Sequence, residues 1–196
     1  MLDEITAIGS AEQKGRESMI SRRKFFSLLP LVPPVCKALV AHNAEWDQFA
    51  AELSRALSSL QKGQFLILET KADQYYVQFA GGGSLGMRTE SVSNGYLNEE
   101  RRLSDKACMK LLDLGWKHPT IIPDSINDVR GYKGHGSPNY FLNLDVPVPY
   151  RSVANLAVNT LRQVFRATHP RQLQYSAFAK QGGSIEFPRL RIASIK

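Results

Sequence analysis

The chain has 196 residues, of which 43% are hydrophobic and 22% are charged, and this balance excludes a wholly disordered chain or a collagen-like fibre. Its formal net charge of +7 is compatible with nucleic acid, an anionic membrane or an acidic protein as partner. Cys36 and Cys108 are too few for a disulfide framework or a zinc site of the usual spacing, and no apolar run has the length of a transmembrane span.

Residues 1–43 are predicted to form a flexible N-terminal extension. Arg22 and Arg23 precede an apolar run that contains three prolines, and Lys37 follows it. A twin arginine before an apolar stretch is typical of an export signal, whereas the prolines and Lys37 favour a Pro-rich linker. Both interpretations stay open, as does a start at Met19 in place of Met1. Export predicts removal of the residues before about position 44.

Residues 44–196 have the pattern of one domain that contains both helices and strands. Apolar residues recur at three- and four-residue steps from Trp46 to Leu60, which predicts an amphipathic helix that ends near Gly63. Three short β-type segments joined by turns follow, and they predict an antiparallel meander: 64–70, 73–80 and 85–93.

The second half of the domain continues with a short helix after Ser104, which is a favourable N-cap residue. The Gly-, Pro- and Asp-rich stretch 120–138 is predicted to be a long loop. The remaining segments are a strand, the clearest helix of the chain and two C-terminal strands: 139–146, 151–167, 173–178 and 185–195. The expected fold is α+β, an antiparallel β-meander packed against N-terminal and C-terminal helices.

No set of residues has the spacing of a catalytic or metal site. On the predicted helices, no histidine lies three or four residues from another His, Cys or acidic residue, and Cys108 falls on an apolar helix stripe. The glycines at 81–83 lack the Lys-Ser/Thr of a phosphate-binding loop. We therefore predict a protein that is not an enzyme and uses no metal or cofactor. A hydrolase built around His135 and Glu90 is kept as an alternative.

The positive charge is concentrated at the C-terminal end of the chain. Residues 145–196 contain 8 Lys or Arg and 2 Asp or Glu, whereas residues 45–144 contain 11 and 12. A basic segment of this kind can contact phosphates, but no nucleic-acid recognition motif accompanies it. A basic nucleic-acid-binding accessory protein is therefore the second hypothesis.

Motifs spread over the domain carry a resemblance to a known family. In chain order they are Trp46-x-x-Phe49, Leu57-x-x-Leu60-x-x-Gly63, Tyr76-Val77-Gln78-Phe79-Ala80, Glu90-Ser91-Val92-Ser93-Asn94, Arg102-Leu103-Ser104, Leu114-Gly115-Trp116-x-x-Pro119, Leu161-Arg162-x-Val164-Phe165 and Leu173-x-Tyr175-x-Ala177-Phe178. From about Ala44 to Phe178 the chain resembles the TY-Chap N-terminal domain family, which is grouped with type III secretion chaperones and YbjN-like proteins. The loop 120–138 and the residues before Ala44 depart from that pattern.

The resemblance implies a non-enzymatic, chaperone-like module that binds peptide or protein segments. It further implies a cytoplasmic protein with a link to secretion or conflict systems, and a homodimer is a hypothesis that rests on it alone. The export interpretation of Arg22-Arg23 stands against the cytoplasmic location.

The predicted meander also indicates where a peptide would bind. Helices that pack on one face of a sheet leave its other face or an edge strand available to an extended peptide. On the second predicted strand Tyr76 and Gln78 alternate with Val77 and Phe79, so that one set enters the core and the other lines a groove. The predicted peptide-binding residues are Tyr76, Gln78, Glu90, Asn94 and Trp116. A purely structural role for these side chains is the alternative.

Overall fold

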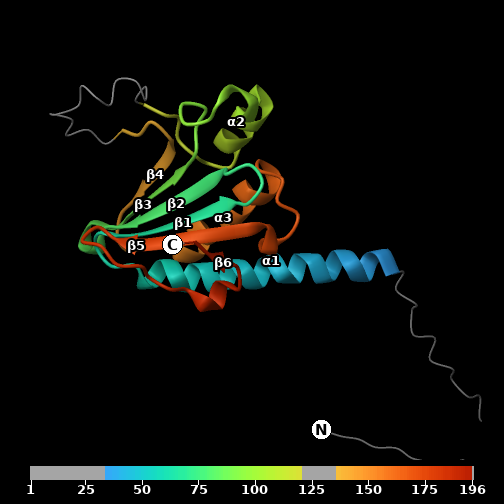
Figure 1. The fold of residues 1–196 in the computed structure, drawn as a ribbon, viewed down its shortest axis with the longest axis horizontal. Helices are drawn as coiled ribbons and strands as arrows, with labels where there is room; N and C mark the ends of the chain where they lie inside the picture. Colours follow the sequence, from blue (N-terminus) through green and yellow to red (C-terminus); the bar gives the residue numbers. More distant parts are fainter. Residues whose placement is uncertain (1–33, 121–135, 196) are drawn as a thin grey trace, which may run out of the picture. The chain divides into compact units, whose positions relative to one another are not determined.

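A six-stranded sheet with two helices on one of its faces forms the domain (Figure 1). The computed structural model describes residues 34–120 and 136–195. The helices and strands are α1 (Pro34–Ser59), β1 (Gln64–Thr70), β2 (Tyr76–Gly81), β3 (Met87–Ser91), α2 (Asp105–Asp113), β4 (Tyr140–Leu144), α3 (Tyr150–Gln163), β5 (Leu173–Ala179) and β6 (Ala193–Ser194). The strand order is β4-β3-β2-β1-β5-β6, and every pair is antiparallel except β5 with β6. The predicted α+β fold is therefore confirmed.

Helix α1 begins ten residues before the predicted start at residue 44. Pro34 is its first residue. Proline suits this position because an N–H in the first turn of a helix has no hydrogen-bond acceptor within the helix, and because the fixed φ of proline is close to the helical value. The predicted apolar stripe is confirmed, because Trp46, Phe49 and Leu53 are all at most 4% exposed. Residues 1–33, which include Arg22 and Arg23, lie outside the part of the chain that the structure describes.

The meander forms at the predicted segments with small shifts in their ends. In the β2–β3 hairpin the Gly82 N–H donates to the Gly86 carbonyl oxygen at 2.8 Å. Gly86 has a φ of +85°, and a Cβ at this position would collide with the Leu144 carbonyl oxygen of β4. Only glycine tolerates both the positive φ and the close contact with Leu144. The glycine therefore allows the end of the hairpin to lie against β4.

The later elements agree with prediction except at the C-terminus. Ser104 caps α2 by accepting a hydrogen bond from the Ala107 N–H at 3.3 Å, and β4, α3 and β5 occur where they are expected. The predicted strand 185–195 is wrong for most of its length. A 3-10 turn over Pro188–Leu190 interrupts it, because proline cannot donate to a strand ladder, and only Ala193–Ser194 pairs as β6.

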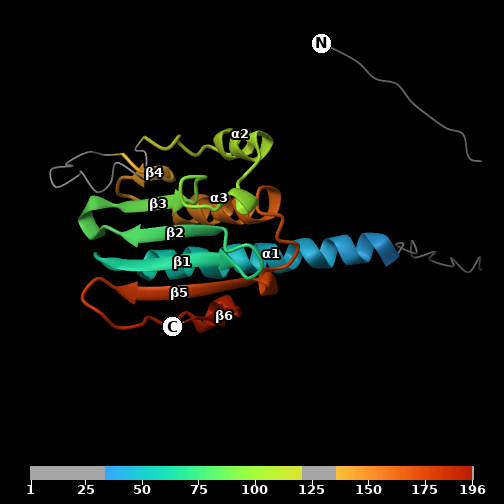
Figure 2. The same ribbon diagram turned by 45° about the horizontal axis from the view of Figure 1, so that its top comes forward.

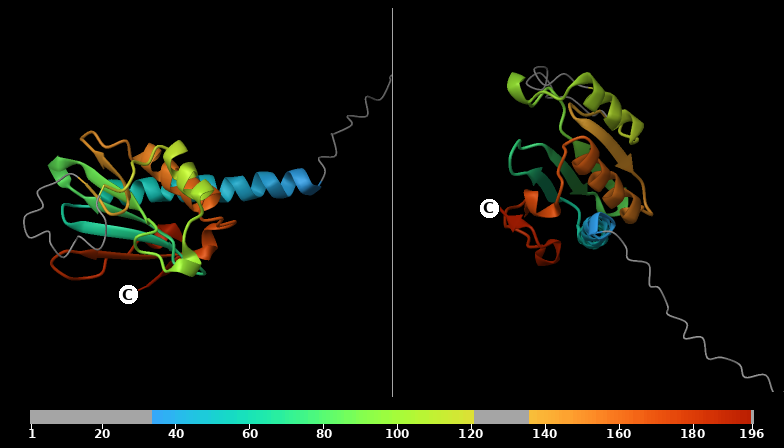
Figure 3. Two further views of the ribbon diagram at one scale, coloured as in Figure 1. Left: turned by 90° about the horizontal axis from the view of Figure 1, so that it is seen from above. Right: turned by 90° about the vertical axis from the view of Figure 1, so that its right-hand side faces the viewer.

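The two faces of the sheet differ in what covers them. Helices α1 and α3 lie against one face (Figures 2 and 3), where Leu66, Leu68, Val77 and Phe79 are 0% exposed. The alternating residues of the same strands point to the opposite face, which no helix covers within the described residues. We call this opposite side the open face. None of the helices that the structure describes is long and apolar enough to cross a membrane.

Candidate functional site

The open face has a polar half over β2, β3 and β4. Gln78 of β2 stands directly opposite Glu90 of β3, since the two residues are register partners in an antiparallel pair. Arg88 precedes Glu90 by two residues and therefore points to the same face. Strand alternation thus places three polar side chains side by side at the centre of the sheet.

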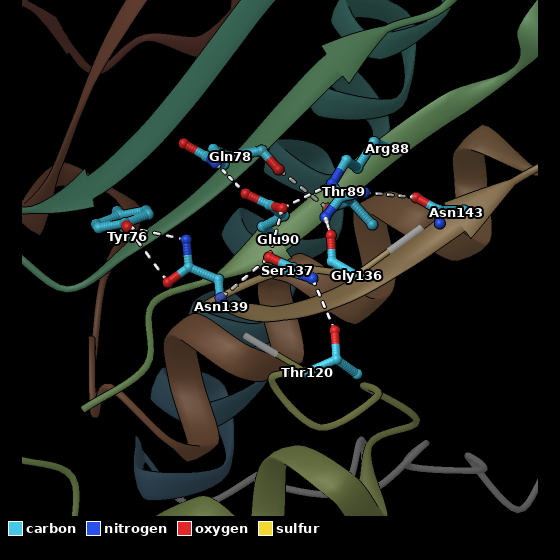
Figure 4. Close-up of polar contacts among 10 residues, drawn as sticks. All are labelled: Tyr76, Gln78, Arg88, Thr89, Glu90, Thr120, Gly136, Ser137, Asn139 and Asn143. Carbon is cyan, nitrogen blue, oxygen red and sulfur yellow. Dashed lines mark hydrogen bonds and ion pairs between the residues drawn. The ribbon is translucent and has the colours of Figure 1, made fainter. Parts of the chain in front are cut away.

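Glu90 is the centre of this polar half, and it is only 8% exposed (Figure 4). Its Oε1 accepts hydrogen bonds from Ser137 Oγ at 2.7 Å and from Arg88 Nε at 2.6 Å. Its Oε2 accepts a hydrogen bond from Gln78 Nε2. Three donors from three different residues therefore engage both oxygens of one buried carboxylate. A buried carboxylate is stable in a protein when it is paired in this way.

The environment of Glu90 keeps its carboxylate ionised. Burial alone acts to raise the pKa of Glu90, but hydrogen bonds from Ser137, Arg88 and Gln78 and the charge of Arg88 outweigh burial, so the pKa lies below its ordinary value of 4.5. A general base at neutral pH needs a pKa near 7 and an accessible lone pair. Glu90 has neither, and its geometry favours positioning of its neighbours over proton transfer.

Arg88 connects the network to the edge of the sheet. Its Nη2 donates to the Gly136 carbonyl oxygen at 2.6 Å and its Nη1 donates to Asn143 Oδ1 at 3.2 Å. Its guanidinium lies over the ring of Phe141 with 5.1 Å between Cζ and the ring centroid. The arginine thereby fixes the segment that enters β4.

A second cluster joins Tyr76 to the same segment. Asn139 Nδ2 donates to the Tyr76 hydroxyl at 3.1 Å, and Asn139 Oδ1 accepts from the Ser93 N–H at 3.1 Å. Burial raises the pKa of Tyr76, and neighbouring Tyr96 and Glu90 raise it further. The tyrosine hydroxyl therefore stays protonated. Tyr96 is 48% exposed beside these residues, and it extends the polar half towards solvent.

The apolar half of the open face lies at one end of β1 and β5, because the outward positions at the other end hold Glu69, Ser176 and Gln174. Phe65 and Phe178 are register partners on these strands, and their rings stack with centroids 5.2 Å apart. Phe178 is 40% exposed, and Ile67 and Ala80 beside the pair are half-buried. Aromatic side chains with this much exposure on a sheet face are typical of an interaction surface.

The structure brings three of the five predicted site residues together and places two elsewhere. Tyr76, Gln78 and Glu90 share the open face. Asn94 bonds the backbone of Leu103 in both directions, with its Nδ2 donating at 2.9 Å and its Oδ1 accepting at 2.7 Å, and so closes the loop before α2. Trp116 is 3% exposed in the core, where its Nε1 donates to Thr160 Oγ1 of α3 at 2.8 Å.

Several residues of the open face were not predicted. The period-two pattern of the strands indicates that three of these side chains point outward: Phe65, Ile67 and Phe178. They form one patch only because β5 pairs with β1, and the sequence alone does not indicate that pairing. Ser137 lies at the end of the predicted loop 120–138 and Asn139 is the first residue of the predicted strand 139–146, and no local pattern indicates their partners. Residues 121–135 of that loop, and with them His135, lie outside the described ranges.

No metal site occurs in the part of the chain that the structure describes, since it contains no cluster of three or more His, Cys, Asp or Glu side chains that could hold an ion. Cys108 is half-buried, and its Sγ lies 3.9 Å from the Leu103 carbonyl oxygen, in agreement with the predicted packing role.

The comparison with known families gives one match. A model named TY-Chap3, described as "T3SS (YopN, CesT) and YbjN peptide-binding chaperone 3", matches residues 40–179. No curated protein and no solved structure matches the chain significantly. The matched span includes β1 to β5 and therefore both halves of the open face.

Proposed function

Because the chain belongs to the TY-Chap3 family of peptide-binding chaperones, we propose that its open face binds an extended segment of a client protein. The family match confirms the resemblance that the sequence motifs indicated, and it implies a peptide-binding chaperone role. The position of the binding surface is our proposal.

One observation supports this position: an exposed aromatic pair lies next to a polar network on a sheet face that no described helix covers. An extended peptide directs every second side chain to the surface on which it lies, so apolar ones at one end of the contact can pack on Phe65 and Phe178 while polar ones at the other end meet Gln78 and Tyr76. We assign Glu90 the role of holding Gln78 and Arg88 in place. Asn94 and Trp116 are assigned structural roles away from this surface.

Further parts of the proposal rest on the family alone. We propose that the protein acts by binding, without catalysis or a cofactor, in the cytoplasm, and that its clients belong to secretion or conflict systems. A homodimer is a further hypothesis that rests on the family alone. Export through Arg22-Arg23 is the competing location, and fractionation of cells that express the full chain tests it, because an exported form loses its N-terminal residues.

Nucleic-acid binding through the basic C-terminal quarter is the competing function. Arg162 lies over the ring of Trp46 with Cζ 5.6 Å from the ring centroid, and Arg189 and Arg191 line a pocket with His169. No nucleic-acid recognition motif accompanies these arginines, and the matched family is described as a peptide-binding chaperone, which favours a peptide or protein client.

Selection from a random peptide library displayed on phage tests the proposal with the full-length chain. We expect peptides with alternating apolar residues to be enriched, and their affinity to fall about tenfold or more in Phe178→Asp, since a buried charge would replace an aromatic contact. Leu85→Asp is the matched control, because Leu85 is 74% exposed in the turn between β2 and β3. If no peptide is enriched, or if both variants bind as the natural chain does, the open face is not the client site.

A further inference from the structure

A cleft of about 670 Å³ is lined by residues of α2, of the loop before α2 and of the C-terminal end of α3. Its volume falls within the roughly 300–1,000 Å³ that is usual for ligand sites. The outer side of α2, the loop before α2 and the turn between β1 and β2 form its walls. None of the five predicted site residues lines it.

The floor of the cleft is apolar and rigid. Tyr75 and Phe165 stack with ring centroids 5.1 Å apart, and the Tyr75 hydroxyl donates to the Arg101 carbonyl oxygen at 2.9 Å. Leu103 is 7% exposed beside them. Met109 lines the same cleft from α2 and is 58% exposed, which is unusual for a large apolar side chain. A large apolar side chain of a partner could therefore pack between the rings and the methionine.

The rim of the cleft carries more positive than negative charge. Its cations are Arg102, Lys106, Lys110 and Arg166, and its anions are Asp73 and Asp113. Across the ranges that the structure describes, no ion pair involves any of these four cations. Three of the four are exposed, and Lys110 is half-buried. Carboxylates of a partner that approach this rim would meet charges that no other group neutralises.

Arg166 occupies a backbone position that favours glycine. It has a φ of +57° in the turn that follows α3, where the Ala167 N–H donates back to the Leu161 carbonyl oxygen at 2.9 Å. A left-handed residue at a helix end of this kind is usually glycine, and a residue with a Cβ is held there at a cost of about 1 kcal/mol. Strained residues of this type are concentrated at functional sites. The residue that has this strained backbone conformation therefore also contributes a positive charge to the rim of the cleft.

We propose that this cleft is a second client subsite, which takes an acidic segment with a large apolar side chain between carboxylates. The apolar residue would lie on Tyr75 and Phe165, and the carboxylates would pair with Lys106, Lys110 and Arg166. This inference rests on the proposed function and adds the chemistry of the client. A phosphate backbone fits less well, because Asp73 and Asp113 interrupt the positive rim and the floor is apolar.

Fluorescence polarisation with synthetic peptides tests the subsite in the full-length chain. The probe is a labelled peptide with a central leucine pair flanked by aspartates and glutamates, and its amide counterpart, with asparagine and glutamine in their place, is the reference. We expect the acidic peptide to bind about tenfold more tightly than the amide peptide, and this difference to shrink as salt rises. Equal affinity for the two peptides would overturn the proposal.

Two variants locate the binding. The double variant Lys106→Glu with Lys110→Glu should remove the preference for the acidic peptide. Lys62→Glu with Lys117→Glu makes the same change in charge at two exposed residues outside the cleft, and it should keep most of the preference. If both double variants lose it equally, the preference reflects net charge and the cleft has no part in it. Arg166→Gly should weaken binding while the melting temperature stays equal or rises, an outcome that a merely structural role for Arg166 would not give.

The same measurements separate this proposal from the proposed function. Peptides selected on the open face should keep their affinity for the Lys106→Glu/Lys110→Glu variant and lose it for Phe178→Asp. If the library peptides bind and the acidic peptide does not, only the cleft proposal fails. If the acidic peptide binds and no library peptide depends on Phe178, only the open-face proposal fails. An oligonucleotide that displaces the acidic peptide at equal charge would overturn the cleft as a peptide subsite.

Discussion

The open face and the cleft beside α2 differ in whether their charged side chains have partners within the protein. On the open face, Glu90 is 8% exposed and accepts hydrogen bonds from Ser137, Arg88 and Gln78. In the cleft, exposed cations form no ion pair with the other residues that the structure describes. A charge with a complete set of partners stabilises the fold that holds it, whereas a charge without partners is available to a ligand.

This comparison predicts that substitutions on one surface mainly change the stability of the fold, whereas substitutions on the other mainly change the affinity for a ligand. Changes at buried or saturated groups should lower the free energy of unfolding. Changes at the rim of the cleft should leave the free energy of unfolding almost unchanged and alter affinity.

Trp116→Ala should be the most destabilising of these changes. The indole joins the two helical walls of the cleft, because Trp116 follows α2 directly and donates to Thr160 of α3 at 2.8 Å. Removal of a buried tryptophan usually costs about 3–5 kcal/mol, and we expect a loss in this range from urea unfolding. Trp116→Phe keeps most of the volume, and it should cost less than half as much. A loss below about 1 kcal/mol for Trp116→Ala would contradict the structural role.

Glu90→Leu should lower the free energy of unfolding by about 2–3 kcal/mol, because it leaves the partly buried Arg88 and the buried Ser137 hydroxyl without their acceptor. Lys110→Leu is the matched control in the cleft, where we expect a change within about 0.5 kcal/mol, since no partner is lost. Urea unfolding of both variants measures the difference. Equal losses would mean that the two surfaces do not differ in the way proposed.

The contribution of Glu90 should also depend on pH. Its pKa in the folded chain lies below the ordinary value of 4.5, so the carboxylate stabilises the fold above that pH, and this contribution is lost as the pH falls through the folded pKa. The difference in free energy of unfolding between the natural chain and Glu90→Gln should therefore be constant from neutral pH to about pH 5 and shrink below it. Urea unfolding of both proteins along a pH series measures this difference. A difference that grows on acidification would contradict the sign.

The sequence predicted the secondary structure well where local patterns determine it. The stripe of α1, the hairpins around the glycines and the cap at Ser104 depend on neighbouring residues, and all three are confirmed. The start of α1 was missed because a proline usually argues against a helix, whereas Pro34 occupies the one turn that tolerates it.

The candidate site was predictable only in part, because much of it depends on contacts between distant segments. Gln78 and Glu90 belong to one hairpin, so their adjacency follows from strand register. Ser137 reaches Glu90 across 47 positions of the chain, and no local pattern marks it. Trp116 appeared suitable for ligand contact as a large ring at a helix end, but its N–H found a buried partner in Thr160.

The pairing of β5 with β1 has a consequence for the order in which the protein acquires its activity. Thr70 of β1 pairs with Leu173 of β5, so the central strand waits for a partner made roughly 100 residues later. Until β5 leaves the ribosome, Phe65 has no Phe178 to stack on, and the apolar half of the open face does not exist. A growing chain can therefore fold its meander early, yet the apolar half of the open face can hold a client only after β5 has been made.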